Sequence, residues 1–165
     1  MKLLILPGFS QKNKQWGQEA AEYLQNDFEV IIHEWKHWET GKSSDFSEEF
    51  ELESIVNKVG NQEINVLAKS VGTHISMLLL DKGLKINKLI LCGLPSENKL
   101  YKKLVNFPSK EVIAFQNVQD PFATHKEVDE FLGKINKDVK VISKPRTDHH
   151  YPFYEDFRKF LTSGE

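Results

Sequence analysis

The stretch at residues 64–73 reads Ile-Asn-Val-Leu-Ala-Lys-Ser-Val-Gly-Thr, and its hydrophobic pattern changes there from that of a strand to that of a helix. The first half is a short run of mostly apolar residues, which is typical of a strand buried on both faces of a parallel sheet. The second half opens an apolar segment of helical period that extends to residue 80. Ser70 therefore stands at a predicted junction between a strand and a helix.

The same alternation of strand and helix continues along the whole chain. Short apolar runs predict further strands at residues 2–6, 28–33, 86–92, 111–115 and 139–143. Apolar residues with helical spacing lie at residues 16–24, 52–59 and 128–135, and a last helix begins after residue 152. Repeated strand–helix units favour right-handed crossovers with helices on both faces. We therefore predict a single doubly wound α/β domain over residues 1–165, with three layers and about six parallel strands.

Composition excludes several classes of function. The 165 residues suffice for one core, and 22 basic against 24 acidic residues leave a net charge of −2. This balance argues against a nucleic-acid partner and against a polybasic membrane surface. The single cysteine, Cys92, excludes an internal disulfide and a cysteine-based zinc site. Since no apolar run is long enough for a membrane-spanning helix or a signal peptide, we expect a cytoplasmic protein.

Small residues flank Ser70 at the two positions that a nucleophile elbow requires. In the pattern small-x-Ser-x-Gly, Ala68 and Gly72 let a strand and a helix meet across a sharp turn, which exposes the serine hydroxyl. The same turn directs the backbone N–H of Val71 to the position where an oxyanion would form. A serine that caps an ordinary helix is the alternative, because this short pattern also arises by chance.

Two more chemically useful residue types follow later strands. Asp120 lies one loop beyond the fifth predicted strand, where a carboxylate could orient a histidine; a turn aspartate before a proline is the alternative. His149 and His150 lie in the loop after the sixth strand. Ligands of open parallel sheets bind outside the carboxyl ends of the strands. We therefore expect Ser70, Asp120 and one of these histidines to meet at one edge of the sheet.

The ends of the first and second strands supply further candidates. Gly8 allows a tight turn after the first strand, and the N–H of Phe9 could act as a second oxyanion donor; a simple strand-end turn is the alternative. Trp35 and Trp38 follow the second strand. We expect these two indoles, with Gly8, to line the substrate pocket, while ordinary packing beneath the polar loop that follows is the alternative.

Taken together and in chain order, these residues resemble the α/β-hydrolase family. The resemblance is carried by Leu6-Pro7-Gly8-Phe9, Ala68-Lys69-Ser70-Val71-Gly72, Asp120 and Asp148-His149. It is greatest for the short branch without a lid, which includes small serine hydrolases related to the retinoblastoma-binding serine hydrolase. Ala68 stands where that family usually has glycine, and Lys69 places a charged residue beside the nucleophile.

The resemblance implies a role for each site residue. Ser70 would be the nucleophile, Asp120 the acid and His149 the base, and the N–H groups of Phe9 and Val71 would form the oxyanion hole. His149 fits the family's His-x-aromatic pattern, while His150 remains the alternative base.

No cofactor or metal is implied. Residues 33–37 match the zinc-protease pattern H-E-x-x-H, but that pattern works only on a helix, and here it continues a predicted strand, which would leave His37 in a loop.

We expect a serine hydrolase that cleaves a small ester, thioester or amide, with a small-molecule acyl compound as its partner. No lid is expected beyond residues 95–109, which predicts an open, shallow pocket. The rival hypothesis is a catalytically weak or inactive module that binds a protein through a Trp35/Trp38 rim.

Overall fold

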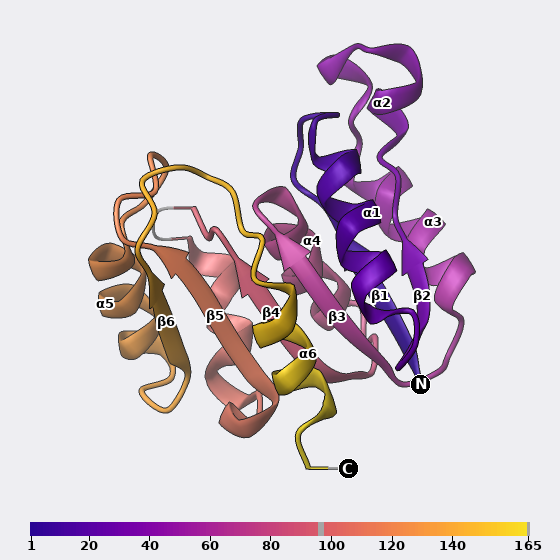
Figure 1. The fold of residues 1–165 in the computed structure, drawn as a ribbon. Helices are drawn as coiled ribbons and strands as arrows, with labels where there is room; N and C mark the ends of the chain where they lie inside the picture. Colours follow the sequence, from indigo (N-terminus) through magenta and orange to yellow (C-terminus); the bar gives the residue numbers. More distant parts are fainter. Residues whose placement is uncertain (96–97, 165) are drawn as a thin grey trace.

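The computed structural model describes residues 1–95 and 98–164, and its centre is one sheet of six parallel strands (Figure 1). The strands are, in chain order, β1 (Lys2–Leu6), β2 (Glu29–Ile32), β3 (Ile64–Lys69), β4 (Ile86–Cys92), β5 (Val112–Asn117) and β6 (Lys140–Lys144). Their order in the sheet is β2-β1-β3-β4-β5-β6. From β1 the chain steps outward to β2, and from β3 it steps outward the other way. The order of the strands therefore reverses between β1 and β3.

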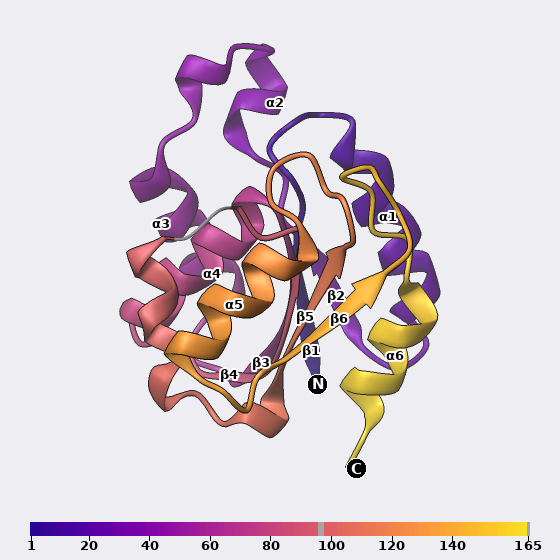
Figure 2. The same cartoon turned by 90° about the vertical axis from the view of Figure 1, so that its left-hand side faces the viewer.

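Helices cover both faces of this sheet and produce a three-layer α/β fold (Figure 2). One face carries α1 (Asn13–Leu24) and α6 (Tyr154–Thr162), and the other carries α3 (Glu48–Val59), α4 (Val71–Asp81) and α5 (His125–Ile135). Each face has its own hydrophobic cluster, because successive strand residues point to opposite sides. Leu4 and Leu6 join the cluster beneath α3, α4 and α5, whereas Leu3 and Ile5 join the cluster beneath α1 and α6.

The predicted fold class is confirmed. All six predicted strands are present; residues 2–6 and 86–92 have the predicted boundaries, and the ends of the other four differ by at most two residues. The helix predicted from the apolar spacing at residues 128–135 is present as α5, and Thr124 and Glu127 form a reciprocal capping box at its beginning. No helix within the described ranges is long and apolar enough to cross a membrane.

The main departure from the predicted elements follows β2. Residues expected to form a loop include a short helix, α2 (Lys36–Thr40), which ends at Gly41 in the left-handed conformation (φ +71°), and a 3₁₀-helix, η1 (Ser43–Asp45). A five-residue helix is too short to show a hydrophobic period, so its sequence carries no helical signal. In Figure 1, α2 projects beyond the edge of the sheet at which the strands end.

Residues 95–109 lie between β4 and β5. The sequence predicts no lid beyond this segment. Ser96 and Glu97 lie outside the described residues. The following 3₁₀-helix, η2 (Lys99–Asn106), buries Tyr101 and Leu104 in the cluster beneath α4 and α5. A further 3₁₀-helix, η3 (Ser109–Glu111), leads into β5.

Candidate active site

The predicted site residues follow the carboxyl ends of four different strands. Phe9 follows β1, Ser70 follows β3, Asp120 follows β5 and His149 follows β6. In the sheet, β1 and β3 are direct neighbours, and Leu6 pairs with Ala68 at their ends. The turn at Phe9 and the turn at Ser70 therefore lie side by side where the strand order reverses, which is the position at which open parallel sheets bind ligands.

Ser70 adopts a backbone conformation that serine rarely takes. Its φ is 54° and its ψ is −118°, and it is the only non-glycine residue with positive φ in the described part of the chain. The Ser70 N–H donates to the Cys92 carbonyl at 2.9 Å. The Ser70 carbonyl accepts hydrogen bonds from the N–H and the Oγ1 of Thr73 at 2.9 and 2.6 Å. Bonds on both sides of the turn therefore hold the strained conformation in place.

Gly72 shows why a glycine follows two positions after the serine. A Cβ atom on Gly72 would come within 3.0 Å of the Leu6 carbonyl oxygen, closer than real Cβ atoms approach a backbone atom. The first turn of α4 thus packs directly against the end of β1. Ala68, two positions before Ser70, is fully buried in the sheet and pairs in register with Leu6 and Leu91, so its methyl group is accommodated in the core.

Asp120 and His149 form a hydrogen-bonded pair. Nδ1 of His149 lies 2.6 Å from Oδ2 of Asp120, which is 3% exposed, and Tyr151 Oη donates to the same oxygen at 2.6 Å. Burial alone would raise the pKa of the Asp120 carboxyl, but hydrogen bonds from His149, Tyr151 and the Phe122 N–H outweigh it and bring the pKa below its usual range. An ionised Asp120 can fix the orientation of the imidazole. The structure pairs His149, and not His150, with this carboxylate.

The loop that carries His149 is held by Asn117, a residue that the sequence analysis did not select. Asn117 is fully buried at the end of β5, and its Nδ2 donates to the carbonyls of Asp148 and His150 at 2.8 and 2.9 Å. These two carbonyls flank His149 on both sides. Arg146 braces the same loop through a bidentate pair with Asp148 at 2.9 and 2.5 Å. No sequence signal separates Asn117 from other polar residues at strand ends.

His149 approaches the Ser70 turn across the end of β4. A Cβ atom on Gly93 would lie 2.7 Å from Cε1 of His149, so the imidazole rests on the Gly93 backbone. The neighbouring residue, Cys92, accepts the Ser70 N–H. Nε2 of His149 is buried and has no hydrogen-bond partner among the described residues. The structure thus contains the hydrogen bond between Asp120 and His149, and it places the Ser70 turn against the backbone at the end of β4 on which the His149 ring rests. Ser70 and His149 are not hydrogen-bonded to each other.

The turn at Gly8 and Phe9 is supported from below by two indoles. Trp35 Nε1 donates to the Gly8 carbonyl at 3.1 Å, and Trp38 Nε1 donates to the Phe9 carbonyl at 2.8 Å. Trp35 is 0% exposed and Trp38 is 7% exposed. Both rings therefore pack beneath the turn, where their N–H groups find acceptors, and they present no open pocket wall and no protein-binding rim.

Within the described residues, the two expected oxyanion donors have free backbone N–H groups, whereas the carbonyl of Phe9 is hydrogen-bonded. The Phe9 carbonyl is occupied by Trp38 and by Nε2 of His37. Across the described ranges, the N–H groups of Phe9 and Val71 donate no hydrogen bond. These donors thus remain free on the two neighbouring turns.

The two histidines of the H-E-x-x-H stretch take part in the same support. His33 Nε2 lies 2.6 Å from Glu51 Oε2, and Glu51 Oε1 accepts the Lys36 N–H at 2.8 Å. His37 was expected in a loop but lies in α2, where its Nε2 contacts the Phe9 carbonyl at 2.8 Å. Within residues 1–95 and 98–164, no group of three or more His, Cys, Asp or Glu side chains could hold a metal ion.

A cavity of about 400 Å³ lies beside His149, between the first turns of α1 and the 149–150 loop. Lys69, His149 and His150 line it together with residues of α1. Lys69 is 4% exposed; its Nζ donates to the side-chain oxygen of Asn13 and lies 5.7 Å from the centre of the Trp16 ring. Burial lowers the pKa of the Lys69 ammonium.

Lys69→Met should raise the free energy of unfolding at pH 7. Because the pKa of Lys69 is lowered in the fold, the unfolded chain binds this proton more tightly than the folded protein does. Above pH 10.5, the ordinary pKa of Lys69, the amine is neutral in both states and its ionisation costs no stability. As the pH falls from there through the lowered folded value, protonation of Lys69 increasingly favours the unfolded chain. Urea unfolding at pH 7 and pH 10 measures this effect, and the advantage of methionine should shrink at the higher pH.

Lys14→Met is the control for this comparison, since Lys14 is a half-exposed lysine in α1, the helix that also carries Asn13 and Trp16. It should change the stability little at either pH. A Lys69→Met protein less stable than the wild type at pH 7 would contradict the prediction.

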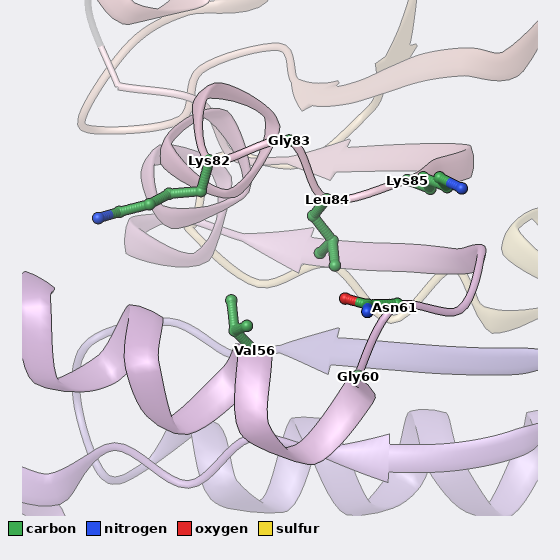
Figure 3. A pocket seen from close by; sticks show the side chains of 7 residues that line it. All are labelled: Val56, Gly60, Asn61, Lys82, Gly83, Leu84 and Lys85. Atoms are coloured by element: carbon green, nitrogen blue, oxygen red, sulfur yellow. The ribbon is translucent and has the colours of Figure 1, made fainter.

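A second cavity, of about 260 Å³, lies at the opposite edge of the sheet (Figure 3). It is formed by the end of α3 and the segment that joins α4 to β4, with Val56 and Leu84 facing each other across it. Its described lining contains no serine, cysteine, histidine or carboxylate side chain. Its described lining therefore offers no hydroxyl or thiol nucleophile and no histidine–carboxylate pair.

Comparisons with known proteins support the fold. The sequence matches no family model and no curated protein. Among solved structures, TT1662 from Thermus thermophilus is similar over 97% of this chain and 87% of that chain, with 11% identity and a TM-score of 0.68. XC6422 from Xanthomonas campestris, an α/β serine hydrolase without a lid, is similar over 97% of this chain and 78% of that chain, with 15% identity and a TM-score of 0.60. ClbQ from the colibactin pathway is similar over 98% of this chain and 97% of that chain, with 12% identity and a TM-score of 0.61. The chain thus shares the fold of α/β hydrolases that lack a lid.

Proposed function

We propose that this chain, whose fold is that of lidless α/β serine hydrolases, cleaves a small ester, thioester or amide through an acyl-enzyme. The observation that carries the proposal is the strained conformation of Ser70 at the junction of β3 and α4. A serine that merely caps a helix needs no positive φ, and the Ser70 side chain makes no cap hydrogen bond to α4. A nucleophile elbow needs this conformation, because it exposes the hydroxyl.

The residues around Ser70 can divide the work of acyl transfer. His149 Nε2 would take the Ser70 proton as the hydroxyl oxygen attacks the carbonyl carbon, and the Asp120 carboxylate would stabilise the resulting imidazolium. When the tetrahedral intermediate collapses, His149 returns the proton to the leaving group. Water then attacks the acyl-enzyme with His149 again as the base. The bond between Ser70 and Nε2 would form in the substrate complex, since such bonds are often long before substrate binds.

The two free backbone donors would stabilise the negative charge that develops on the carbonyl oxygen. The N–H groups of Phe9 and Val71 lie on neighbouring turns, at the ends of β1 and β3. One preorganised donor of this kind contributes about 2.7–4 kcal/mol to the transition state in comparable sites. The indoles of Trp35 and Trp38 would keep the Phe9 turn rigid, so their role would be to position the donor and not to contact substrate.

A fluorophosphonate probe tests the proposal, because it reacts covalently with an activated serine. We expect a single adduct on the folded protein, located on Ser70 by peptide mass spectrometry. Ser70→Ala and the urea-unfolded wild type should both remain unlabelled. If the folded wild type carries no adduct on Ser70, and turns over 4-nitrophenyl acetate no faster than Ser70→Ala, the proposed function is wrong.

A further inference from the structure

The cavity beside His149 contains a buried positive charge that the proposed hydrolysis does not use. An ammonium group has three N–H donors, and Lys69 Nζ directs one of them to the side-chain oxygen of Asn13. Across residues 1–95 and 98–164, no carboxylate lies within ion-pair distance of it. Lysine is almost never fully buried without a partner of opposite charge, so a 4%-exposed lysine in this state is unusual.

The carboxylates around the cavity are all bound to other groups. Glu19 accepts hydrogen bonds from Gln15 and Tyr154, Asp120 from His149 and Tyr151, and Asp148 from Arg146. Asp120 and Asp148 act on Lys69 only from a distance. Burial and the positive charges of Lys69 and Arg146 lower the pKa of the His150 imidazole. Lys69 therefore has no counter-ion within ion-pair distance among the described residues; Glu19, which lines the same cavity, is bound by neutral donors and not by the ammonium.

The position of Lys69 relates this charge to the proposed reaction. Lys69 is the residue immediately before Ser70, and its side chain lines the same cavity as His149. Its direction is set by Asn13 and by the Trp16 ring, at the start of α1. Ser70 does not line this cavity, but His149, its proposed base, does. A substrate whose carbonyl lies between Ser70 and His149 would extend past the His149 ring toward the ammonium. The volume of about 400 Å³ suits a short chain that ends in a small charged group.

We propose that this cavity binds an anionic group of the substrate, a carboxylate in the simplest case, through the Lys69 ammonium. The proposal rests on the proposed hydrolase function, and it names the class of substrate: small esters or thioesters with a negative charge near the scissile carbonyl. Lys69 is then a specificity-determining residue, and its buried charge is completed by the ligand. The charge lies either on the acyl part or on the leaving group.

Two pairs of esters distinguish these sources. Mono-4-nitrophenyl adipate and its neutral methyl ester differ in charge on the acyl part, and 4-acetoxybenzoate and its methyl ester differ in charge on the leaving group. After correction for the rates of uncatalysed hydrolysis, we expect kcat/KM to favour the charged member of one pair by about 10- to 100-fold at low salt. Lys69→Met should bring this ratio close to one, whereas Lys14→Met should keep it.

Binding without turnover provides a second readout. In the Ser70→Ala protein, adipate or 4-hydroxybenzoate should give a saturable signal in ligand-observed NMR that weakens with ionic strength. The same signal should be lost in the Ser70→Ala/Lys69→Met protein and kept in Ser70→Ala/Lys14→Met.

The two proposals fail in different ways. Ratios near one for both ester pairs, or ratios that Lys69→Met leaves unchanged, would overturn the anionic-substrate inference even if the fluorophosphonate adduct forms on Ser70. Absence of the adduct and of all ester turnover would overturn the hydrolase function. In that case, binding of the anion that depends on Lys69 would still support the anion site, and absence of such binding would overturn it as well.

Discussion

Replacing Ser70 with alanine should lower kcat/KM for 4-nitrophenyl acetate by about 10⁴-fold, because the attacking hydroxyl is removed while the oxyanion donors remain. The substitution leaves the backbone bonds of the turn intact, since Thr73 and Cys92 bind only the backbone of Ser70. Thermal unfolding by circular dichroism should therefore change little. Ser43→Ala, in the exposed 3₁₀-helix after α2, is the matched control and should retain full activity.

The same assay separates the two histidines. His149→Ala should lose about as much activity as Ser70→Ala, and the double variant should be no slower than either single one, because residues that act as a unit are not additive. His150→Ala should lose far less, since the structure pairs His149 with Asp120. A large loss confined to His150→Ala would show that the base has been assigned to the wrong ring.

Gly72→Ala should destabilise the fold severely. The added methyl group would lie within 3.0 Å of the Leu6 carbonyl oxygen, a backbone atom at the end of β1, which is held in the sheet between β2 and β3. Overpacking of a core costs about 1–3 kcal/mol, and a clash with a backbone atom that cannot move aside lies at or above the top of that range. Since domains are stable by about 5–15 kcal/mol, urea unfolding should show a large fall in the midpoint.

Gly133→Ala is the matched control and should have the opposite sign. Gly133 lies in α5, and a Cβ atom there would meet nothing within 4 Å. Alanine in a helix interior should therefore raise the free energy of unfolding by about 0.5–1 kcal/mol. Equal stabilities of the Gly72→Ala protein and the wild type would contradict the close approach of α4 to β1.

Most of the fold could be predicted, because its signals are local. The buried strands β1, β3 and β4 are short, mostly apolar runs, and the amphipathic helices α1, α3 and α5 show helical spacing. The helix α2 could not be predicted in this way. It has five residues, and His37 and Trp38 reach from it to the Phe9 carbonyl, at the end of β1. Contacts of this kind, between segments distant in sequence, have no periodic pattern.

The same distinction between local signals and long-range contacts applies to the candidate site. Ser70, Asp120 and His149 were found because each follows a strand, and parallel strands end at one edge. Asn117 and Tyr151 were missed, because their roles depend on how the loop after β6 lies against β5. Trp35 and Trp38 were expected at a pocket, but an indole suits a pocket wall and a core equally well. Only the positions of the Gly8 and Phe9 carbonyls decide between the two.

The sequence by itself determined the alternation of strands and helices and the order of chemically useful residues at the strand ends. Both can be read from the spacing of residue types along the chain, because side-chain directions repeat with a fixed period in helices and in strands. The tertiary structure alone decided which histidine binds Asp120, that the tryptophans support a turn, and that Lys69 is buried beside His149 without a counter-ion. These outcomes depend on which distant segments come within hydrogen-bond distance, and on the need of each buried polar group to find a partner there.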